Sequence, residues 1–293
     1  MLKSQRQKDL VFDSVIYAAL FIIMLTMLYP FYYVLIASFN KGSDSLLGGV
    51  YLWPRNFTLE NYRMFMDDPK WVRAFLVSVL RTVSGTLLGL LLTSIVAYGL
   101  SHRDLLFSKV YFTVIVFAMY FSGGLIPYYV VLRSLGLLNS FAVYIVPSML
   151  STFFLLIAIS FFREIPGELK ESAHMDGAGE LTIFFRIILP VSTPVLATMA
   201  LFMGVGQWNS WLDSAYFVQS EELRTLAFRM MEVINKSNSP MDSIAVANSA
   251  SAGVTSFSLQ VTSMVVSIVP IICVYPFLQK YFVHGIMLGS VKG

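Results

Sequence analysis

Long apolar runs separated by polar stretches divide the chain into six segments. They lie at about 11–39, 73–100, 108–132, 141–162, 187–212 and 259–282. A helix of about 20 apolar residues is long enough to cross the roughly 30 Å hydrocarbon core of a membrane. The pattern therefore predicts an all-α membrane protein with six transmembrane helices and both ends of the chain on the same side.

The first run is expected to stay in the mature protein. It follows a polar start that carries Lys3, Arg6 and Lys8. A signal peptide has a shorter apolar core and a cleavage site of small residues, whereas this run is long and ends at Asn40. We interpret it as a retained first span.

A polar, helix-forming stretch interrupts the apolar pattern between the fourth and fifth runs. Residues 168–176 favour a helix, and Gly177 is a typical stop after its last turn. On such a helix Leu169, Ser172 and Ala173 share a small, weakly apolar face. A face of this kind suits insertion into a groove on another protein.

The distribution of basic residues indicates which side of the membrane each connection occupies. The short connections on the side of the chain ends carry Arg103, Lys109, Arg163, Lys170 and Arg186. Most basic residues of the opposite side lie in long loops, which influence orientation little. The ends and the polar stretch 168–176 are therefore predicted to be cytoplasmic.

Two long loops are predicted on the outer side, at 40–70 and 216–257. The first contains a helix start at 58–61, and the second a short amphipathic helix at about 223–233. Either loop could contact a partner outside the cell or be a simple solvated connection.

The third run contains residues that break a helix. Gly123, Gly124 and Pro127 would interrupt its backbone hydrogen bonds, which is tolerated where helices pack together or line a cavity. We name these three as a candidate gate or kink. Ordinary helix packing explains them equally well.

Polar side chains within the spans are the candidate pathway residues. Arg81 lies well inside the second run, where a charge is costly unless it is paired or hydrated. The fifth run ends in a polar and aromatic cluster, which would suit a sugar or form an aromatic belt at the membrane interface. Its candidate residues are Gln207, Trp208, Asn209, Trp211 and Asp213. Arg81 could instead pair with Asp213 or with a carboxylate of a partner subunit.

Composition agrees with a membrane protein and limits its chemistry. The chain of 293 residues is 57% hydrophobic and 13% charged, with a mean hydropathy of +0.72 and a net charge of +3. Soluble domains are nearer a quarter charged. The charge is scattered, so no basic block indicates nucleic acid. Cys273 is the only cysteine, which excludes an intrachain disulfide and a CxxC site.

Motifs of enzymes are missing from the sequence. There is no GxxxxGK[ST] loop to hold ATP, and no HExxH or GxSxG. His102, His174 and His284 are far apart along the chain, which gives no basis for a metal site. We expect no catalytic site, no metal and no cofactor on this chain, and transport driven by an ion gradient or by a separate subunit.

The polar stretch and the residues after it resemble a known family. Glu171-Ser172-Ala173, Gly177 and Ile187-x-Leu189-Pro190 match the EAA motif of binding-protein-dependent ABC importer permeases, with Ser172 in place of the usual alanine. Residues 126–129, 135–140, 208–209 and 281–293 look like the carbohydrate-uptake branch, the MalG-type subunit. The resemblance covers residues from about 75 to the end.

The resemblance implies a fold, partners and roles. The fold would be the type I ABC importer (MetI-like) permease, with an N-terminal helix and outer loop at 1–72, a permease core at 73–285 and a cytoplasmic tail at 286–293. The segment 163–186 would carry the coupling helix that docks on an ATPase subunit. The docking residues it implies are Glu171, Ser172, Ala173, His174, Met175, Asp176, Gly177, Ile187, Leu189 and Pro190. Its implied tail contacts to the ATPase are Gly289, Ser290, Val291, Lys292 and Gly293.

The same resemblance implies an assembly in a prokaryotic cell membrane. A second homologous permease, usually not identical, would complete the pathway, and two cytoplasmic ATPase subunits would hold ATP and magnesium. An extracytoplasmic binding protein would deliver an oligosaccharide, and the loop 216–257 would reach towards it. ATP-driven closure of the ATPase pair would switch the spans between inward-facing and outward-facing states.

The cargo is the least determined feature. Residues 121–127 are similar to permeases for oligosaccharides of plant or algal polysaccharides, including uronic-acid oligomers. Arg81, Arg133 and Arg224 would suit such an acidic substrate. A neutral oligosaccharide, another solute, ion-coupled transport through Asp213 and a scaffolding role all stay open.

Overall fold

The structure is a computed structural model that describes residues 2–102, 104–121, 123–237 and 254–289. Contacts divide the chain into two compact units, residues 1–68 with 232–268 and residues 69–231 with 269–293. The described residues are helical throughout their regular structure, apart from one isolated bridge between Asn40 and Phe57. The predicted all-α class is confirmed.

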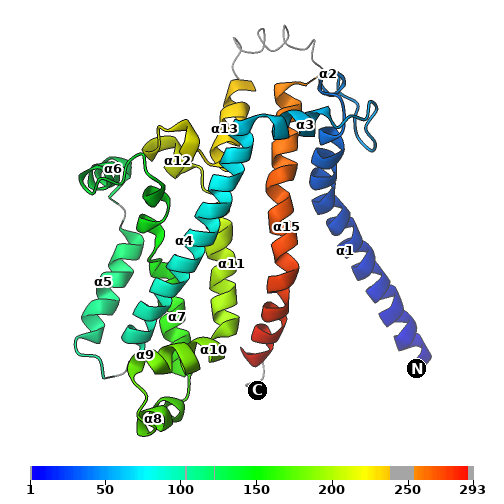
Figure 1. Ribbon diagram of the computed structural model, residues 1–293. Helices are drawn as coiled ribbons and strands as arrows, with labels where there is room; N and C mark the ends of the chain where they lie inside the picture. The colour runs from blue at the N-terminus through cyan, green and yellow to red at the C-terminus, as the bar shows by residue number, and fades with distance from the viewer. Residues whose placement is uncertain (1, 103, 122, 238–253, 290–293) are drawn as a thin grey trace. The chain divides into compact units, whose positions relative to one another are not determined.

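The first unit consists of one long helix, a folded loop and part of the last helix. Its helices are α1 (Leu2–Ser38), α2 (Gly42–Ser45), α3 (Glu60–Asp67) and the first part of α15 (Ser256–Gly289) (Figure 1). The amide of Glu60 donates to the Thr58 hydroxyl over 3.1 Å, which starts α3 where the sequence predicts a helix.

Buried asparagines fold the loop between α1 and α3. The Asn40 side chain is fully buried, donates to Asp44 over 2.9 Å and accepts from the Asn56 amide over 2.8 Å. The Asn61 side chain donates to the carbonyls of Ser38 and Asn40, each over 2.9 Å. These bonds satisfy backbone groups that the loop would otherwise leave unpaired. The loop is therefore a folded element.

Three helices lie side by side in the second unit (Figure 1). They are α4 (Pro69–Ser101), α7 (Thr152–Glu164) and α11 (Thr193–Asn209). Small residues of α4 allow close approach: a side chain on Gly85 would lie 2.9 Å from Gln207, and one on Gly89 would lie 3.2 Å from Met203. Tyr98 joins a fully buried cluster with residues of α7 and of the segment after it.

Three of the six predicted spans are bent. The bent pairs are α5 (Ser108–Tyr120) with α6 (Leu125–Ser134), the turns Phe141–Tyr144 and Val146–Ser148 with α7, and the segment Glu180–Val191 with α11. Their bends are 114°, 43° and 82°. The described residues therefore contain three helices long and apolar enough to cross a membrane, or up to six when each bent pair counts as one span.

The bend before α11 lies at Ser192. Glu180–Val191 comprises α9 (Glu180–Ile183), a π-helical stretch (Phe184–Ile188) and α10 (Leu189–Val191). The helix direction changes at Ser192, which is not helical and is fully buried. Pro194 follows in the first turn of α11, where its missing N–H breaks no helical bond.

The chain after α11 forms further short helices, the last of which continues from the second unit into the first. They are α12 (Leu212–Phe217), the turn Glu221–Leu223 and α13 (Leu226–Ser237). The predicted amphipathic helix is confirmed, and it begins after Thr225, whose hydroxyl accepts from the Phe228 amide. Arg229 donates to Glu221, and this hydrogen bond lowers the pKa of the Glu221 carboxyl. Residues 238–253 of the predicted loop lie outside the described residues.

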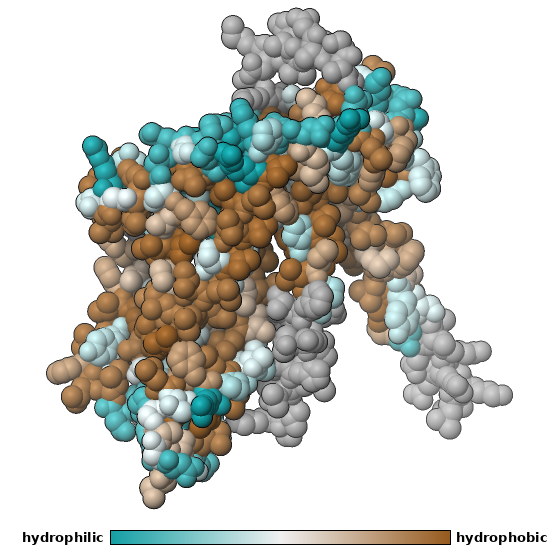
Figure 2. Space-filling model, viewed as in Figure 1, coloured by the Kyte–Doolittle hydropathy of each residue, from teal (hydrophilic) through white to brown (hydrophobic). Residues whose placement is uncertain are grey.

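Hydrophobic side chains cover the middle of the second unit, and polar side chains gather at its ends (Figure 2). One polar end surrounds α8 (Gly167–Met175), and the opposite end lies near α6 and α12 (Figures 1 and 2). This arrangement is typical of a helical unit that crosses a lipid bilayer.

Candidate functional site

The helix α8 has the boundaries that the sequence predicts. It ends where Gly177 adopts a φ of +81°, a left-handed conformation that glycine reaches without a steric penalty. The Gly177 amide bonds to the His174 carbonyl, and the Ala178 amide to the Ala173 carbonyl, each over 3.0 Å. These two bonds form the Schellman motif that commonly ends helices.

The face of α8 that is available to a partner differs from the predicted one. Ala173 is 8% exposed and packs into the core of its own chain, whereas Leu169 and Ser172, which were predicted to share a face with it, are exposed. Glu171 and Ser172 are exposed, and Met175 is 89% exposed. The helix buries the side that carries Ala173 and exposes Glu171 and Ser172 together with the apolar side chains of Leu169 and Met175.

A partly exposed cluster of polar side chains lies beside Ala173; in it the Glu180 side chain is 54% exposed and that of His174 is 49% exposed. The Tyr98 hydroxyl of α4 donates to the Glu180 carboxylate of α9 over 2.5 Å. The Nε2 atoms of His174 and His102 lie 3.2 Å and 3.7 Å from the same carboxylate. The Lys170 ammonium lies 5.1 Å from the centre of the Tyr98 ring, and burial lowers the pKa of Lys170.

Sequence reasoning missed this cluster. His102 and His174 are 72 positions apart by their numbers, yet the fold brings both to one carboxylate. Tyr98 and Glu180 belong to no motif, so their spacing gives no signal. The available clue is that Lys170, Ala173 and His174 recur at helical spacing, which places a polar group on the buried side of α8.

The later residues of the predicted coupling motif have a packing role in this fold. Ile187 and Leu189 are half-buried and pack against the core cluster, while Pro190 is exposed. They hold the segment that leads into α11. In the predicted tail, Gly289 is the last residue of α15, and residues 290–293 lie outside the described residues.

Arg81 is buried and surrounded by acceptors in the middle of the second unit. Its guanidinium donates to the Gln207 side chain over 2.9 Å, to the Ser210 carbonyl over 3.0 Å and to the Asp213 carboxylate. It also lies 4.6 Å from the centre of the Tyr144 ring. Of the alternatives for Arg81, the intrachain pair with Asp213 is the one that the fold forms.

Gln207 belongs to the same network. Its oxygen accepts from Arg81, and its nitrogen donates to the Ser148 hydroxyl over 2.6 Å. Only glycine at position 85 leaves room for the Gln207 side chain, since an added Cβ would lie 2.9 Å from its amide. The network therefore joins α4, α11 and the turn before α7.

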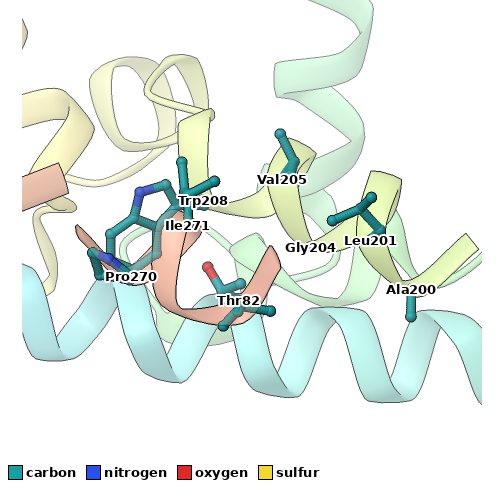
Figure 3. Close-up of a pocket in the computed structure, with 9 residues that line it drawn as sticks. Thr82, Ala200, Leu201, Gly204, Val205, Trp208, Pro270 and Ile271 are labelled. Atoms are coloured by element: carbon teal, nitrogen blue, oxygen red, sulfur yellow. The ribbon is translucent and has the colours of Figure 1, made fainter. Parts of the chain in front are cut away.

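A mostly apolar pocket lies between α4, α11 and the adjacent part of α15 (Figure 3). Thr82 faces it from α4, and Trp208 lies near Pro270 and Ile271 of α15. Trp208 is 8% exposed and packs edge-on against Phe75, with ring centres 5.9 Å apart. It is therefore a packing residue in this fold, in contrast to a lipid-facing belt.

The remaining candidates of the cluster are more accessible. Asn209 is exposed and Trp211 is half-buried. The predicted kink is present, since Gly124 has a φ of +83° and Pro127 lies in the first turn of α6. Gly123 and Gly124 also line a surface pocket with Pro127. Whether these residues act as a gate stays a prediction.

The outer arginines differ in accessibility. Arg133 is exposed in the last turn of α6. Arg224 donates to the Ser214 carbonyl and lies 4.2 Å from the centre of the Phe228 ring. Of these two, Arg133 is the one whose charge lies open on the surface.

Comparison with known proteins gives a family model and full-length relatives. Residues 70–288 match the family described as "Binding-protein-dependent transport system inner membrane component". The polygalacturonan/rhamnogalacturonan transport system permease protein YtcP of Bacillus subtilis is 36% identical over 98% of this chain and 100% of its own length. The arabinooligosaccharides transport system permease protein AraQ of the same organism is 27% identical over 94% of each chain.

Solved structures show the same fold. A chain from a bacterial ABC transporter involved in the import of the acidic polysaccharide alginate superposes with a TM-score of 0.86 at 28% identity, covering 94% of this chain and 98% of that one. A chain from the alginate transporter in complex with an alginate pentasaccharide-bound periplasmic protein matches with a TM-score of 0.59 at 13% identity, which bears on the fold alone.

Proposed function

The chain belongs to the family of binding-protein-dependent transport system inner membrane components, and from this premise we propose that it is the permease subunit of an ATP-driven oligosaccharide importer. The observation that carries the proposal is the exposed side of α8, where Glu171, Ser172 and Met175 face away from the core of the chain. A helix that buries one side on its own chain and exposes both polar and apolar side chains on the other suits docking on another subunit. The relatives named for oligosaccharide transport support the same function.

The proposed assembly contains partners on both sides of the membrane. Two cytoplasmic ATPase subunits bind ATP and magnesium and contact α8, while a second homologous permease completes the pathway. An extracytoplasmic binding protein docks at the opposite end, near α6 and α12 (Figure 1). In this arrangement both ends of the chain are cytoplasmic, and ATP hydrolysis takes place in the partners.

ATP-driven transport is favoured over ion-coupled transport by the position of Asp213. A secondary transporter needs an intramembrane carboxylate that can bind and release an ion. Asp213 is instead paired with Arg81 and accepts from the Ser210 hydroxyl over 3.1 Å. Its charge is matched within the chain.

We propose an acidic oligosaccharide as the cargo. The relatives named for polygalacturonan/rhamnogalacturonan and for alginate support an acidic substrate, and the exposed Arg133 would attract it. Arg81 contributes less to this argument than the sequence suggests, because its charge is matched by Asp213. Uptake of trigalacturonate should exceed uptake of cellotriose by at least tenfold in proteoliposomes with the complete transporter. Faster uptake of the neutral trisaccharide would refute the acidic cargo.

The docking role is tested by reversing the charge of Glu171. The Glu171→Lys variant should lose uptake and retain less ATPase subunit on purification, because a lysine replaces an exposed carboxylate on the docking side of α8. The matched control is Asp104→Lys, a charge reversal at an exposed position in the connection after α4. Normal ATPase retention in Glu171→Lys, or equal loss in both variants, would contradict the role of α8.

A further inference from the structure

The attachment of α8 to the rest of the chain depends on few interactions. Glycines lie in the backbone on both sides, Gly167 at its start and Gly177 and Gly179 after its end. Ala173 is the one residue of α8 that is buried, and a methyl group supplies little apolar contact. Ile165 and Ala178, just outside α8, pack in or against the same core, so α8 itself is held by a small apolar contact together with polar contacts.

Those polar contacts converge on Glu180. Its carboxylate accepts from Tyr98 over 2.5 Å and lies 3.2 Å from His174 Nε2 and 3.7 Å from His102 Nε2. His174 belongs to α8, Tyr98 to α4, and Glu180 is the first residue of α9. The cluster therefore connects three elements at one carboxylate.

The tyrosine side of this cluster is anchored in the core. Tyr98 is buried, and its ring lies 5.3 Å from the ring of Phe184 and 4.9 Å from that of His102, measured between centres. Lys170 of α8 lies over the other part of the same ring. A displacement of α8 would therefore act directly on a residue fixed in α4.

α4 can carry such a displacement across the unit. It is one continuous helix from Pro69 to Ser101, with no proline after its first residue. Tyr98 and Arg81 are 17 positions apart, or about 26 Å along a helix axis. Arg81 in turn bonds to Gln207 at the end of α11 and to Asp213 of α12. Tyr98, near the end of α4, and Arg81, in its first half, are thus held by separate polar networks.

We propose that Tyr98, Glu180 and His174 form a transmission joint that passes the displacement of α8 to α4. They are positioning residues: they contact neither ATP nor cargo, and they keep α8 and α4 moving together. The inference rests on the proposed function, in which an ATPase moves α8. It goes further by assigning the intrachain contacts through which this movement reaches the spans.

The first test separates transmission from assembly. In the complete transporter, Tyr98→Phe removes the hydroxyl bond to Glu180 and keeps the ring, while Glu180→Ala removes the whole acceptor. We expect at least a fivefold fall in trigalacturonate transported per ATP hydrolysed, with normal retention of the ATPase subunits. Glu180→Gln keeps an oxygen for Tyr98 and should restore part of the ratio. Tyr62→Phe is the matched control, since it removes a 2.6 Å contact with Ser38 in the outer loop.

The second test needs no substrate. Spin labels at Met175→Cys in α8 and Leu91→Cys in α4, in a Cys273→Ser background, report the separation of the two helices. The background protein should give one narrow distance distribution that ATP with vanadate leaves unchanged. In Tyr98→Phe and Glu180→Ala the distribution should broaden, and ATP with vanadate should shift it.

The outcomes distinguish the joint from the proposed function. A narrow, unchanged distribution in both variants, an unchanged transport ratio, or loss of the ATPase subunits in Tyr98→Phe would overturn the joint. If the unmodified transporter takes up neither trigalacturonate nor cellotriose, the proposed cargo fails, and the label distances still decide whether the joint exists.

Discussion

Replacing Asp213 by asparagine should destabilise the protein more than replacing its partner Arg81 by methionine. The asymmetry follows from burial, since the side chain of Arg81 is 3% exposed and that of Asp213 is 28% exposed. Asp213→Asn leaves a buried guanidinium whose remaining acceptors, Gln207 and Ser210, are neutral. An uncompensated buried charge typically costs about 3–5 kcal/mol.

Replacing Arg81 by methionine should destabilise the protein less. Methionine at position 81 removes the charge and fills much of the same volume, while Asp213 reaches water and keeps the Ser210 hydroxyl as a donor. The main loss is the donor to the Gln207 oxygen, and an unsatisfied buried acceptor costs about 1–3 kcal/mol. The double variant Arg81→Met/Asp213→Asn should therefore be more stable than Asp213→Asn alone by about 2 kcal/mol.

The assay is unfolding by sodium dodecyl sulfate in mixed micelles, followed by tryptophan fluorescence for the two single variants and the double variant. Uptake kinetics are measured alongside. Additive losses, or a larger loss in Arg81→Met than in Asp213→Asn, would refute a structural ion pair. A raised KM for trigalacturonate in Arg81→Met with unchanged stability would instead identify Arg81 as a substrate contact.

Three further predictions follow from single contacts. Gly85→Ala should destabilise the protein by about 1–3 kcal/mol because its Cβ displaces Gln207, whereas Gly99→Ala, with open space around it, should be neutral or stabilising in the same unfolding assay. Gly177→Ala forces an L-residue to a φ of +81°, so retention of the ATPase subunits should fall about fivefold, equivalent to about 1 kcal/mol; equal retention would contradict the Schellman ending. The folded-state pKa of Glu221 is lowered by Arg229, so this carboxylate stabilises the start of α13 above its usual pKa, and that contribution is lost as pH falls through the lowered value. Hydrogen exchange of α13 should accelerate over that acidic range, and Glu221→Gln should abolish the change.

The sequence predicts the features that depend on local pattern. Apolar runs locate the six helical segments, Gly177 marks the end of α8, and Gly124 and Pro127 mark a break in the third run. Each of these signals acts within a few residues, through hydrogen bonding or backbone conformation. For that reason they can be recognised without knowledge of the fold.

Features that depend on tertiary contact were harder to predict. The pairing of Arg81 with Asp213 stood among open alternatives, because a charge in a span needs a partner but does not identify it. The burial of Ala173 was not predicted, since a small residue suits both a docking face and a tightly packed core. The contact of Tyr98 with Glu180 joins residues 82 positions apart, and nothing in their neighbourhoods links them.

The bend at Ser192 has a consequence for the lipid environment. If α11 crosses the bilayer, the 82° bend sets the segment Glu180–Val191 nearly parallel to the membrane plane. Leu181 and Phe185 are exposed on this segment, and Arg186 beside them suits phospholipid headgroups. The depth of Glu180 is then set partly by the bilayer. Membrane thickness and headgroup charge should therefore influence the contacts of Glu180 with Tyr98 and His174.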